Sequence, residues 1–351
     1  MNLLGTITRG VALRACLAGL LLLLAALLGG CATALSPAEG AAVAGRTYVV
    51  TGASSGFGRG VAERLGALRA NVVLAARRTE LLNEVAARVN AAGGSALVVP
   101  TDVARVEDMQ RLAEQTVARF GRIDVWINNA AVGAIGPFEA IPLEDHARIV
   151  DVNVKGVIHG SHIALRQFKA QGAGTLVNMG SVESEVPLAY HASYAATKAA
   201  VLGLGRALNE ELRLAGVGER IRVTTVMPWA ADTPFFANAA NYSGHRPRML
   251  AMDDPAKVVD VIVRASLYPS EEVPAGWKAR GAVWSHKIAP DLTERISANI
   301  AHAEQFEKSP PAPPTSGAVH RPNPAATGID GGVRARMRQE DAARKEGRSL
   351  P

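Results

Sequence analysis

The sequence predicts an α/β fold in which a parallel sheet is wound with helices on both faces. Between residues 46 and 306, apolar runs of four to seven residues alternate with amphipathic stretches of twelve or more. This alternation is typical of repeated β-α units. A glycine-rich turn directly follows the first run, and the region shows no internal repeat and no second core. We therefore predict a single domain over residues 46–306.

The composition is that of a globular protein, with its excess charge at the two ends. The 351 residues are 48% hydrophobic and 20% charged, which is ordinary for a domain with a large core. The formal net charge is +6, but residues 321–351 contain seven Lys or Arg against four Asp or Glu, and Arg9 and Arg14 are also outside the domain. The domain itself is close to neutral and gives no support for nucleic acid as a partner.

Residues 1–31 have the pattern of a signal or membrane-anchor segment. Arg9 and Arg14 precede an uncharged, leucine-rich stretch, as in an export signal. The stretch contains Leu28-Gly29-Gly30-Cys31, which resembles the lipobox of bacterial lipoproteins, in which the cysteine is lipidated. An uncleaved anchor is the alternative, because about 20 apolar residues suffice to span a bilayer. A buried core helix is the third interpretation.

This segment predicts a membrane-associated protein, either lipid-anchored or single-span, with residues 32–45 as a flexible linker. Positive residues before the apolar stretch place the domain outside the cytoplasm, whereas soluble NADPH is cytoplasmic, so the face of the membrane stays open. The chain has two cysteines, Cys16 and Cys31, so the domain has no disulfide.

The C-terminal residues 307–351 differ in composition from the domain. Ser309 to Gly328 contains six prolines and almost no large apolar residue. Such a segment buries too little surface to fold alone. We expect an extended or disordered tail, with a short charged helix over residues 333–348.

The first apolar run, Tyr48 to Val50, leads into the turn Thr51-Gly52-Ala53-Ser54-Ser55-Gly56-Phe57-Gly58 and then a helix to about Leu68. In a Rossmann-type sheet, a glycine-rich turn at this place lets backbone N–H groups approach a pyrophosphate at the helix N-terminus. The spacing T-G-x-x-x-G-x-G is more particular than the general dinucleotide fingerprint. We predict a dinucleotide site here.

The second predicted strand, Asn71 to Ala75, ends in Ala76-Arg77-Arg78. An NAD site usually presents a carboxylate here to hold the ribose 2′-hydroxyl, whereas a guanidinium fits a 2′-phosphate. The pair therefore favours NADP over NAD, and the alternative is that both arginines are merely solvated. Ser55, where some NADP enzymes carry a second basic residue, weakens the preference.

The third and fourth predicted strands, Ala96 to Pro100 and Val125 to Ile127, each end in polar or small residues. Asp102-Val103 follows the third strand, where the carboxylate is placed to bond an adenine amino group. Asn128-Asn129-Ala130-Ala131 follows the fourth, and its small residues let the backbone pass beneath a cofactor. Asn153 falls inside a predicted helix, and because Asn is a poor helix former we expect a role beyond packing.

Ser181, Tyr194 and Lys198 form the pattern that carries the chemistry. Ser181 ends a predicted strand, Thr175 to Met179, while Tyr194 and Lys198 lie four residues apart in an alanine-rich helical segment, on one face. A phenol is a poor acid near pH 7, but a nearby ammonium favours the phenolate. With Ser181 opposite, the three groups suit carbonyl–alcohol interconversion.

Together these motifs resemble the short-chain dehydrogenase/reductase family over about residues 45–275. The resemblance implies an enzyme in which Tyr194 is the general acid or base, Ser181 positions the carbonyl, and Lys198 lowers the tyrosine pKa and holds the nicotinamide ribose. Asn153 would keep a water in the proton relay. The implied cofactor-binding residues are Gly52, Ser54, Ser55, Gly56, Phe57, Gly58, Arg77, Asp102, Val103, Asn129, Ala130, Lys198, Pro228 and Thr233.

Two residues depart from the family pattern. Ala131 replaces the last glycine of N-N-A-G, and Trp229 replaces the glycine of the Pro-Gly expected after the sixth strand, Arg222 to Val226. We expect the indole to reshape the nicotinamide pocket. The substrate loop over residues 229–252 carries Trp229, Phe235, Phe236 and Tyr242, which favours an apolar pocket.

The leading hypothesis is an NADP-dependent oxidoreductase that interconverts a small carbonyl compound and an alcohol, without a metal and as a homo-oligomer. A non-catalytic NADP-binding regulator and a membrane-tethered scaffold are the alternatives. The intact Ser181, Tyr194 and Lys198 argue against the regulator, and turnover after deletion of residues 309–351 would separate the enzyme from the scaffold.

Overall fold

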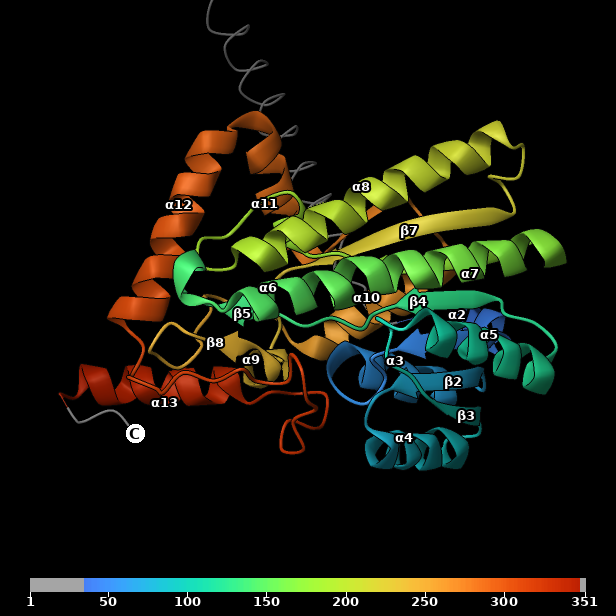
Figure 1. Ribbon diagram of the computed structural model, residues 1–351, viewed down its shortest axis with the longest axis horizontal. Coiled ribbons are helices and arrows are strands. Elements are labelled where there is room, and N and C mark those ends of the chain that lie inside the picture. Colours follow the sequence, from blue (N-terminus) through green and yellow to red (C-terminus); the bar gives the residue numbers. More distant parts are fainter. Residues whose placement is uncertain (1–34, 348–351) are drawn as a thin grey trace, which may run out of the picture.

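Parallel strands form one central sheet in the computed structural model, which describes residues 35–347 (Figure 1). Its strands are β1 Thr47–Thr51, β2 Asn71–Ala76, β3 Ser95–Pro100, β4 Val125–Asn128, β6 Gly174–Met179, β7 Ile221–Pro228 and β9 Glu272–Ala275. Their order across the sheet is β3-β2-β1-β4-β6-β7-β9. The doubly wound parallel sheet is confirmed, and β9 is the strand that the sequence pattern missed.

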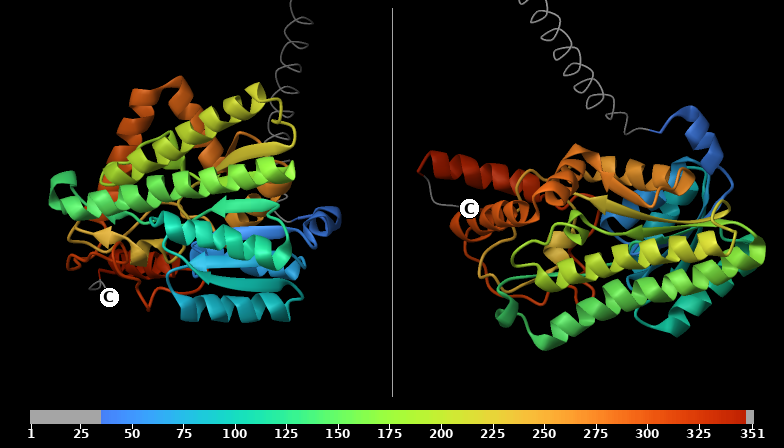
Figure 2. Two further views of the ribbon diagram at one scale, coloured as in Figure 1. Left: turned by 45° about the vertical axis from the view of Figure 1, so that its right-hand side comes forward. Right: turned by 90° about the horizontal axis from the view of Figure 1, so that it is seen from above.

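Helices cover both faces of this sheet, as the two views of Figure 2 show. One face carries α2 Pro37–Val43, α3 Gly56–Ala67, α4 Thr79–Ala91 and α10 Pro255–Leu267. The other carries α5 Val106–Phe120, α6 Leu143–Val150, α7 Gly156–Gln171 and α8 Ala192–Leu214. The chain reverses its winding direction between β1 and β4, so a crevice opens there beyond the carboxyl ends of the strands.

The core divides into two clusters because successive side chains of a strand point to opposite faces. Tyr48 and Val50 of β1 pack with the α3 side, and Val49 packs with the α7 side. All three are fully buried. A sheet covered on both faces needs apolar residues at every strand position, which is why the strands appear in the sequence as continuous apolar runs.

Short elements surround the carboxyl ends of the strands. These are β5 Ala134–Ile135, which pairs with β8 Ala240–Asn241, and the helices α9 Phe235–Asn238, α11 Gly276–Ile288 and α12 Pro290–His302. The α11–α12 pair stands at the upper left of Figure 1, beside the strand ends. All of these elements except β5 come from the C-terminal half of the chain, and together they surround the crevice.

The Pro-rich segment, expected to be disordered, packs against the domain. Thr315 and Asn241 bond each other through both backbone pairs, with N···O distances of 2.7 and 3.0 Å, and the Ala318 amide donates to the Asn238 carbonyl at 2.7 Å. After this point residues 318–330, here called the C-terminal strap, cross the strand-end face and lead into α13 Val333–Lys345. Asp232 accepts from the backbone of Val333 and Arg334 at 2.8 and 3.0 Å, which fixes the start of α13.

The tail folds because the domain supplies the partners that its own composition lacks. Arg248, whose side chain is 1% exposed, bonds Glu340 of α13 and also contacts Glu304 and Asp341. A buried guanidinium requires such paired carboxylates. This long-range ion cluster links segments about a hundred residues apart, and local composition does not reveal it.

The predicted linker is also partly ordered. Residues Pro37–Val43 form α2, which Ser36 caps through a reciprocal bond with Glu39, and Arg264 of α10 binds the Glu39 carboxylate at 2.9 Å. Among residues 35–347, no helix is long and apolar enough to cross a membrane. The predicted signal segment, including Cys31, lies outside the described residues.

Candidate active site

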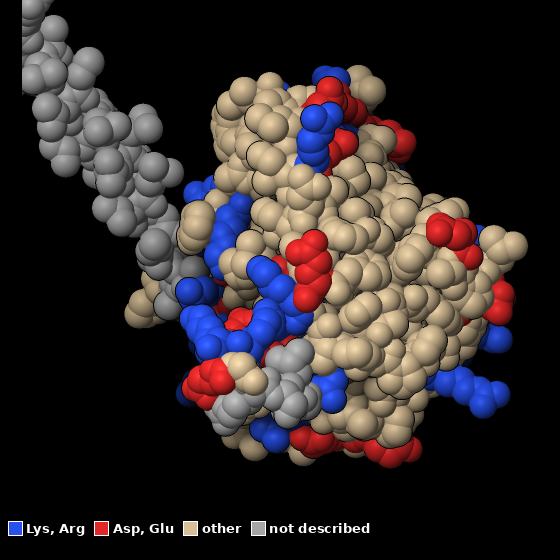
Figure 3. All heavy atoms as spheres, turned by 90° about the vertical axis from the view of Figure 1, so that its left-hand side faces the viewer, with Lys and Arg blue, Asp and Glu red and all other residues tan. Residues whose placement is uncertain are grey.

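A cavity of about 340 Å³ lies beyond the carboxyl ends of the strands. Figure 3 views the molecule from this end, where Lys and Arg gather along one side and the remaining surface carries few charges. Most of the predicted site residues line the cavity: Gly52, Ser54, Ser55, Gly56, Phe57, Arg77, Asp102, Val103, Asn129, Ala130, Ser181, Tyr194, Lys198, Pro228 and Thr233. Gly58 and Asn153 lie behind the wall. One cavity therefore unites motifs that are scattered through the sequence.

The glycine-rich turn forms one end of the cavity, here called the phosphate end. Gly52 has a φ of +68°, and a Cβ on Gly58 would lie 2.3 Å from the Gly52 carbonyl oxygen. Both positions therefore require glycine. Asn129 donates from its side chain to the Thr51 carbonyl at 2.9 Å and fastens the turn to the end of β4. The N-terminus of α3 at Gly56 thus faces the cavity.

Ser181, Tyr194 and Lys198 meet at the other end, here called the catalytic end. Ser181 follows β6 and starts a short 3₁₀ turn, Val182–Ser184, while Tyr194 and Lys198 are on the first two turns of α8. The Lys198 ammonium donates to the Met179 carbonyl at 2.7 Å and lies 5.5 Å from the centroid of the Tyr194 ring. The predicted helical register is correct.

The electrostatics of this end differ from the expectation. Burial raises the pKa of Tyr194, the Glu183 carboxylate raises it further, and a hydrogen bond with Ser181 lowers it. Burial also lowers the pKa of Lys198 to about 8, against the opposing effect of Glu183. In the protein alone, the phenol is thus held in its protonated form. That is the form needed to give a proton to a carbonyl oxygen.

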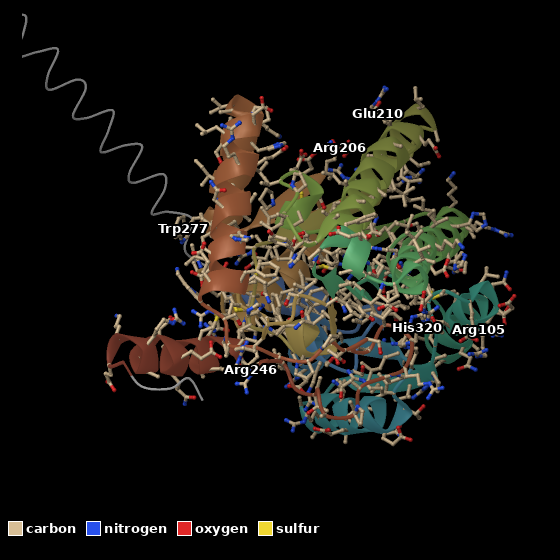
Figure 4. The ribbon with its side chains drawn as sticks, turned by 60° about the vertical axis from the view of Figure 1, so that its left-hand side comes forward. Arg105, Arg206, Glu210, Arg246, Trp277 and His320 are labelled. Atoms are coloured by element: carbon tan, nitrogen blue, oxygen red, sulfur yellow. The ribbon has the colours of Figure 1, made fainter. Side chains whose placement is uncertain are left out.

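Arg77 and Arg78 lie at the phosphate end, where the C-terminal strap contacts both. Arg77 donates to the carbonyls of His320 and Ala318 at 2.9 and 2.8 Å. Arg78 donates to the carbonyls of Asn323 and Ala326, both at 2.8 Å. Figure 4 labels His320 of the strap, which lies well apart from Trp277 at the start of α11.

The strap also forms a hydrogen bond with the start of α3. The Gly56 amide donates to the Gly328 carbonyl at 2.8 Å, and Arg78 further bonds the hydroxyls of Ser54 and Ser55 at 3.0 and 2.7 Å. Burial lowers the pKa of Arg78, and the neighbouring Arg77 lowers it further. Two adjacent guanidiniums with neutral oxygen partners form a ready anion site.

Asp102 is not free to act as a simple adenine acceptor. Its carboxylate binds Arg148 at 2.6 Å and accepts from the Ala104 amide at 3.0 Å. Burial opposes ionisation, but these two partners prevail and lower the pKa of Asp102. The side chain still borders the cavity beside Val103, where a bound adenine would have to share it with Arg148.

The sequence model of the short chain dehydrogenase family matches residues 46–243, which include both ends of the cavity. The chain is a member of this family. It is 31% identical over 278 residues to the uncharacterized oxidoreductase YxnA of Bacillus subtilis, which covers 78% of each chain. It is also 36% identical over 195 residues to 3beta-hydroxysteroid dehydrogenase 1 of Eggerthella lenta, which covers 55% of this chain and 73% of the relative.

A solved structure agrees with this assignment. The short-chain dehydrogenase from Streptomyces avermitilis is 30% identical, with a TM-score of 0.59, and the match covers 72% of this chain and 98% of that one. Family membership and the shared sheet make this chain an NAD(P)-dependent dehydrogenase or reductase.

Asn153, the asparagine of the family pattern, forms hydrogen bonds that hold neighbouring elements together. Asn153 lies in a π-helical turn, Asp151–Lys155, between α6 and α7, and such turns are frequent at functional sites. Its side chain is fully buried and bonds both backbone groups of Val132 at 2.9 Å and the Thr197 hydroxyl at 3.0 Å. These contacts tie the β4 loop to α8. The role in holding a water stays a prediction.

The predicted substrate loop, residues 229–252, contributes apolar side chains to the cavity wall, as expected, with one exception. Trp229, Phe235 and Phe236 line the cavity, and Phe235 packs against the Tyr194 ring with centroids 5.3 Å apart. Tyr242 instead points away and donates to Asp145 at 2.7 Å. Thr233 lines the cavity opposite Gly56, 3.5 Å from the position of a Cβ there.

Three parts of the site escaped the sequence analysis. Glu183 and His191 line the catalytic end and form a buried pair. Ile300 and Ala301 of α12 belong to the wall, and so do residues of the strap. Glu183 and His191 lie between recognised motifs and could have been found by asking which polar residues flank Ser181 and Tyr194. The contacts of α12 and the strap carry no local sequence pattern.

Proposed function

We propose that this protein is an NADP-dependent oxidoreductase that interconverts a ketone or aldehyde and the corresponding alcohol on a largely apolar substrate. The observation that carries the proposal is the joining of two sites in one cavity. Ser181, Tyr194 and Lys198 meet at the catalytic end, and Arg77 and Arg78 present adjacent guanidiniums at the phosphate end. Neither site alone would support a hydride transfer.

The residues present fit a dinucleotide with a 2′-phosphate. The Ser54 and Ser55 hydroxyls accept from Arg78, so the donors at the phosphate end are the Gly56 amide and the two guanidiniums. All of them suit anionic oxygens. Their hydrogen-bond partners within residues 35–347 are neutral oxygens, several of them strap carbonyls, so a phosphate would gain charge-assisted bonds in place of neutral ones. NAD offers no charge at this position and is the less favoured cofactor.

The chemistry at the catalytic end follows from the protonation states. When bound, NADPH supplies the hydride that adds to the carbonyl carbon. Tyr194, held protonated by burial, gives its proton to the carbonyl oxygen, and the Ser181 hydroxyl donates a hydrogen bond to the same oxygen. Lys198, with a pKa of about 8, stabilises the phenolate that remains. In the oxidative direction the phenolate takes the proton from the alcohol.

The wall composition favours an apolar substrate. Trp229, Phe235, Phe236, Met249 and Leu250 all face the cavity. The relative named 3beta-hydroxysteroid dehydrogenase 1 supports a bulky, mainly hydrocarbon substrate of the same kind. Substrate identity is to be found by following NADPH and NADH oxidation with a panel of aliphatic, aromatic and steroid ketones. No cofactor oxidation with any carbonyl class, despite tight NADPH binding, would instead favour a non-catalytic regulator.

We also propose that Cys31 is lipidated and tethers the domain to a membrane surface. The support is the sequence Leu28-Gly29-Gly30-Cys31 after an apolar stretch. Labelling with a palmitate analogue should mark the wild type, and Cys31→Ser should leave a heavier, uncleaved form. An unlabelled wild type of unchanged mass would favour the uncleaved anchor.

A further inference from the structure

Glu183 and His191 form a buried polar pair at the catalytic end that the hydride-transfer chemistry does not use. Both side chains are 8% exposed, and the His191 Nδ1 lies 3.1 Å from the Glu183 Oε1. A carboxylate only accepts hydrogen bonds, so Nδ1 carries the proton. His191 orients one oxygen of Glu183 and leaves the other for a different partner.

The second carboxylate oxygen, Oε2, is buried and has no hydrogen-bond partner. Most buried polar atoms are paired, so each exception calls for an explanation. Glu183 borders the cavity, two residues after Ser181, and its own amide donates to the Ser181 hydroxyl at 3.1 Å. The unpartnered acceptor therefore belongs to a residue of the cavity wall that is hydrogen-bonded to Ser181, the residue proposed to position the carbonyl.

Apolar side chains contribute to the same part of the wall as Glu183, together with the polar groups of the catalytic end. Val182, Val186 and Val283 form a small buried cluster here, and Trp229 packs against it. The Trp229 Nε1 is also buried without a partner. Both residues line the cavity, and an unpaired buried acceptor in a cavity wall favours a ligand that can donate to it over an analogue that leaves it unpaired.

The charge of the substrate group decides whether it can donate a hydrogen bond to Glu183. The carboxylate already favours the charged form of the nearby Lys198. A cationic substrate group would approach the same ammonium and be repelled, whereas a neutral hydroxyl would bond Oε2 without this opposition. We infer that Glu183, oriented by His191, binds a hydroxyl group of the substrate close to the reacting carbonyl, so that the enzyme acts on hydroxy ketones or the matching diols. This inference builds on the proposed carbonyl reductase function.

Matched ketone pairs test it. We would measure kcat/KM with NADPH for 2-hydroxyacetophenone against propiophenone, and for 3-hydroxypropiophenone against butyrophenone, in which a methyl group replaces the hydroxyl. The variants are Glu183→Gln and Glu183→Ala. Glu185→Gln is the control, because Glu185 is two residues further on and binds Arg206 outside the cavity. Thermal melting and NADPH binding check that each variant is folded.

Wild type should prefer the hydroxy ketone of at least one pair, and Glu183→Ala should lose about 10- to 100-fold on that substrate, as expected for a bond to a charged group. The loss on the methyl analogue, which reports how the missing charge affects Lys198, should be about tenfold smaller, and Glu185→Gln should change neither. Equal losses on both members of each pair would overturn the inference, because Glu183 would then act on the proton chemistry alone. If the wild type reduces both members equally, the inference fails and the proposed function stands. If it reduces no ketone, both fail together.

Discussion

The two ends of the cavity are built in different ways. At the catalytic end, Ser181 directly follows β6, and Tyr194 and Lys198 lie on α8. The contacts there join residues close in the sequence: Lys198, for example, donates to the carbonyl of Met179 at the end of β6. At the phosphate end, Arg77 and Arg78 bond a strap that lies more than two hundred residues later in the chain. Local motifs fix the first end, whereas a long-range contact shapes the second.

This difference has a functional consequence. The catalytic end presents its groups ready for a substrate, with the phenol protonated and the ammonium bound to a carbonyl. The phosphate end presents donors whose hydrogen bonds are already made with neutral carbonyls. Binding a 2′-phosphate must therefore exchange partners at the phosphate end, while nothing comparable is required at the catalytic end. The two ends should respond independently to mutation.

The largest expected effect is at the catalytic end. Tyr194→Phe removes the proton donor and should lower kcat by about 10²- to 10⁴-fold, the usual loss for a general acid, with NADPH affinity nearly unchanged. Tyr190→Phe is the matched control, because Tyr190 precedes it by four residues and bonds His302 instead. A Tyr194→Phe enzyme with near wild-type turnover would disprove the assignment.

The next effect is at the phosphate end. Arg77→Asp should weaken NADPH binding at least tenfold, since a charge-assisted bond contributes about 1.5–3 kcal/mol. NADH binding should suffer less, because it lacks the 2′-phosphate. Fluorescence titration of both cofactors measures the ratio. Equal losses would assign Arg77 a structural role in holding the strap.

A third prediction uses pH to test independence. Lys198 loses its proton above its pKa of about 8, so kcat/KM for ketone reduction should fall by about tenfold at pH 9, one unit above that pKa. Glu183→Gln removes a charge that raises this pKa, so the falling limb should move to lower pH. Arg77→Asp should leave the limb in place. A flat profile to pH 9 would contradict the role of Lys198.

The smallest effect concerns the strap. If a 2′-phosphate replaces the strap carbonyls as the hydrogen-bond partner of Arg77 and Arg78, the strap loses these bonds. NADPH should then increase the rate of amide hydrogen exchange in residues 318–330 by a few-fold, and NADH should increase it less. Peptide-resolved exchange mass spectrometry detects this. Slower exchange with both cofactors would mean that the strap closes over the nucleotide instead of yielding to it.

These contrasts explain what the sequence could predict. The six strands that were predicted, the glycine-rich turn and the register of Tyr194 and Lys198 depend on periodicity and local spacing, and these are found, whereas the edge strand β9 was missed. The charged helix predicted over residues 333–348 is found as α13 Val333–Lys345. The order of the Pro-rich segment was not predicted, because it depends on Arg248, Glu340 and the two guanidiniums near β2, which compositional reasoning treats as unrelated surface residues. Glu183 escaped notice because a single acidic residue in a loop is usually solvated, whereas here it is buried and paired with His191.

The most direct test of hydride transfer in this cavity is an isotope experiment. NADPH deuterated at the reactive nicotinamide carbon is incubated with the protein and a ketone that it reduces, and the alcohol is analysed by mass spectrometry and NMR. We predict one deuterium on the carbinol carbon with the wild type, and almost no labelled alcohol with Tyr194→Phe. Cofactor oxidation without deuterium in the alcohol, or equal labelling by both proteins, would contradict the account.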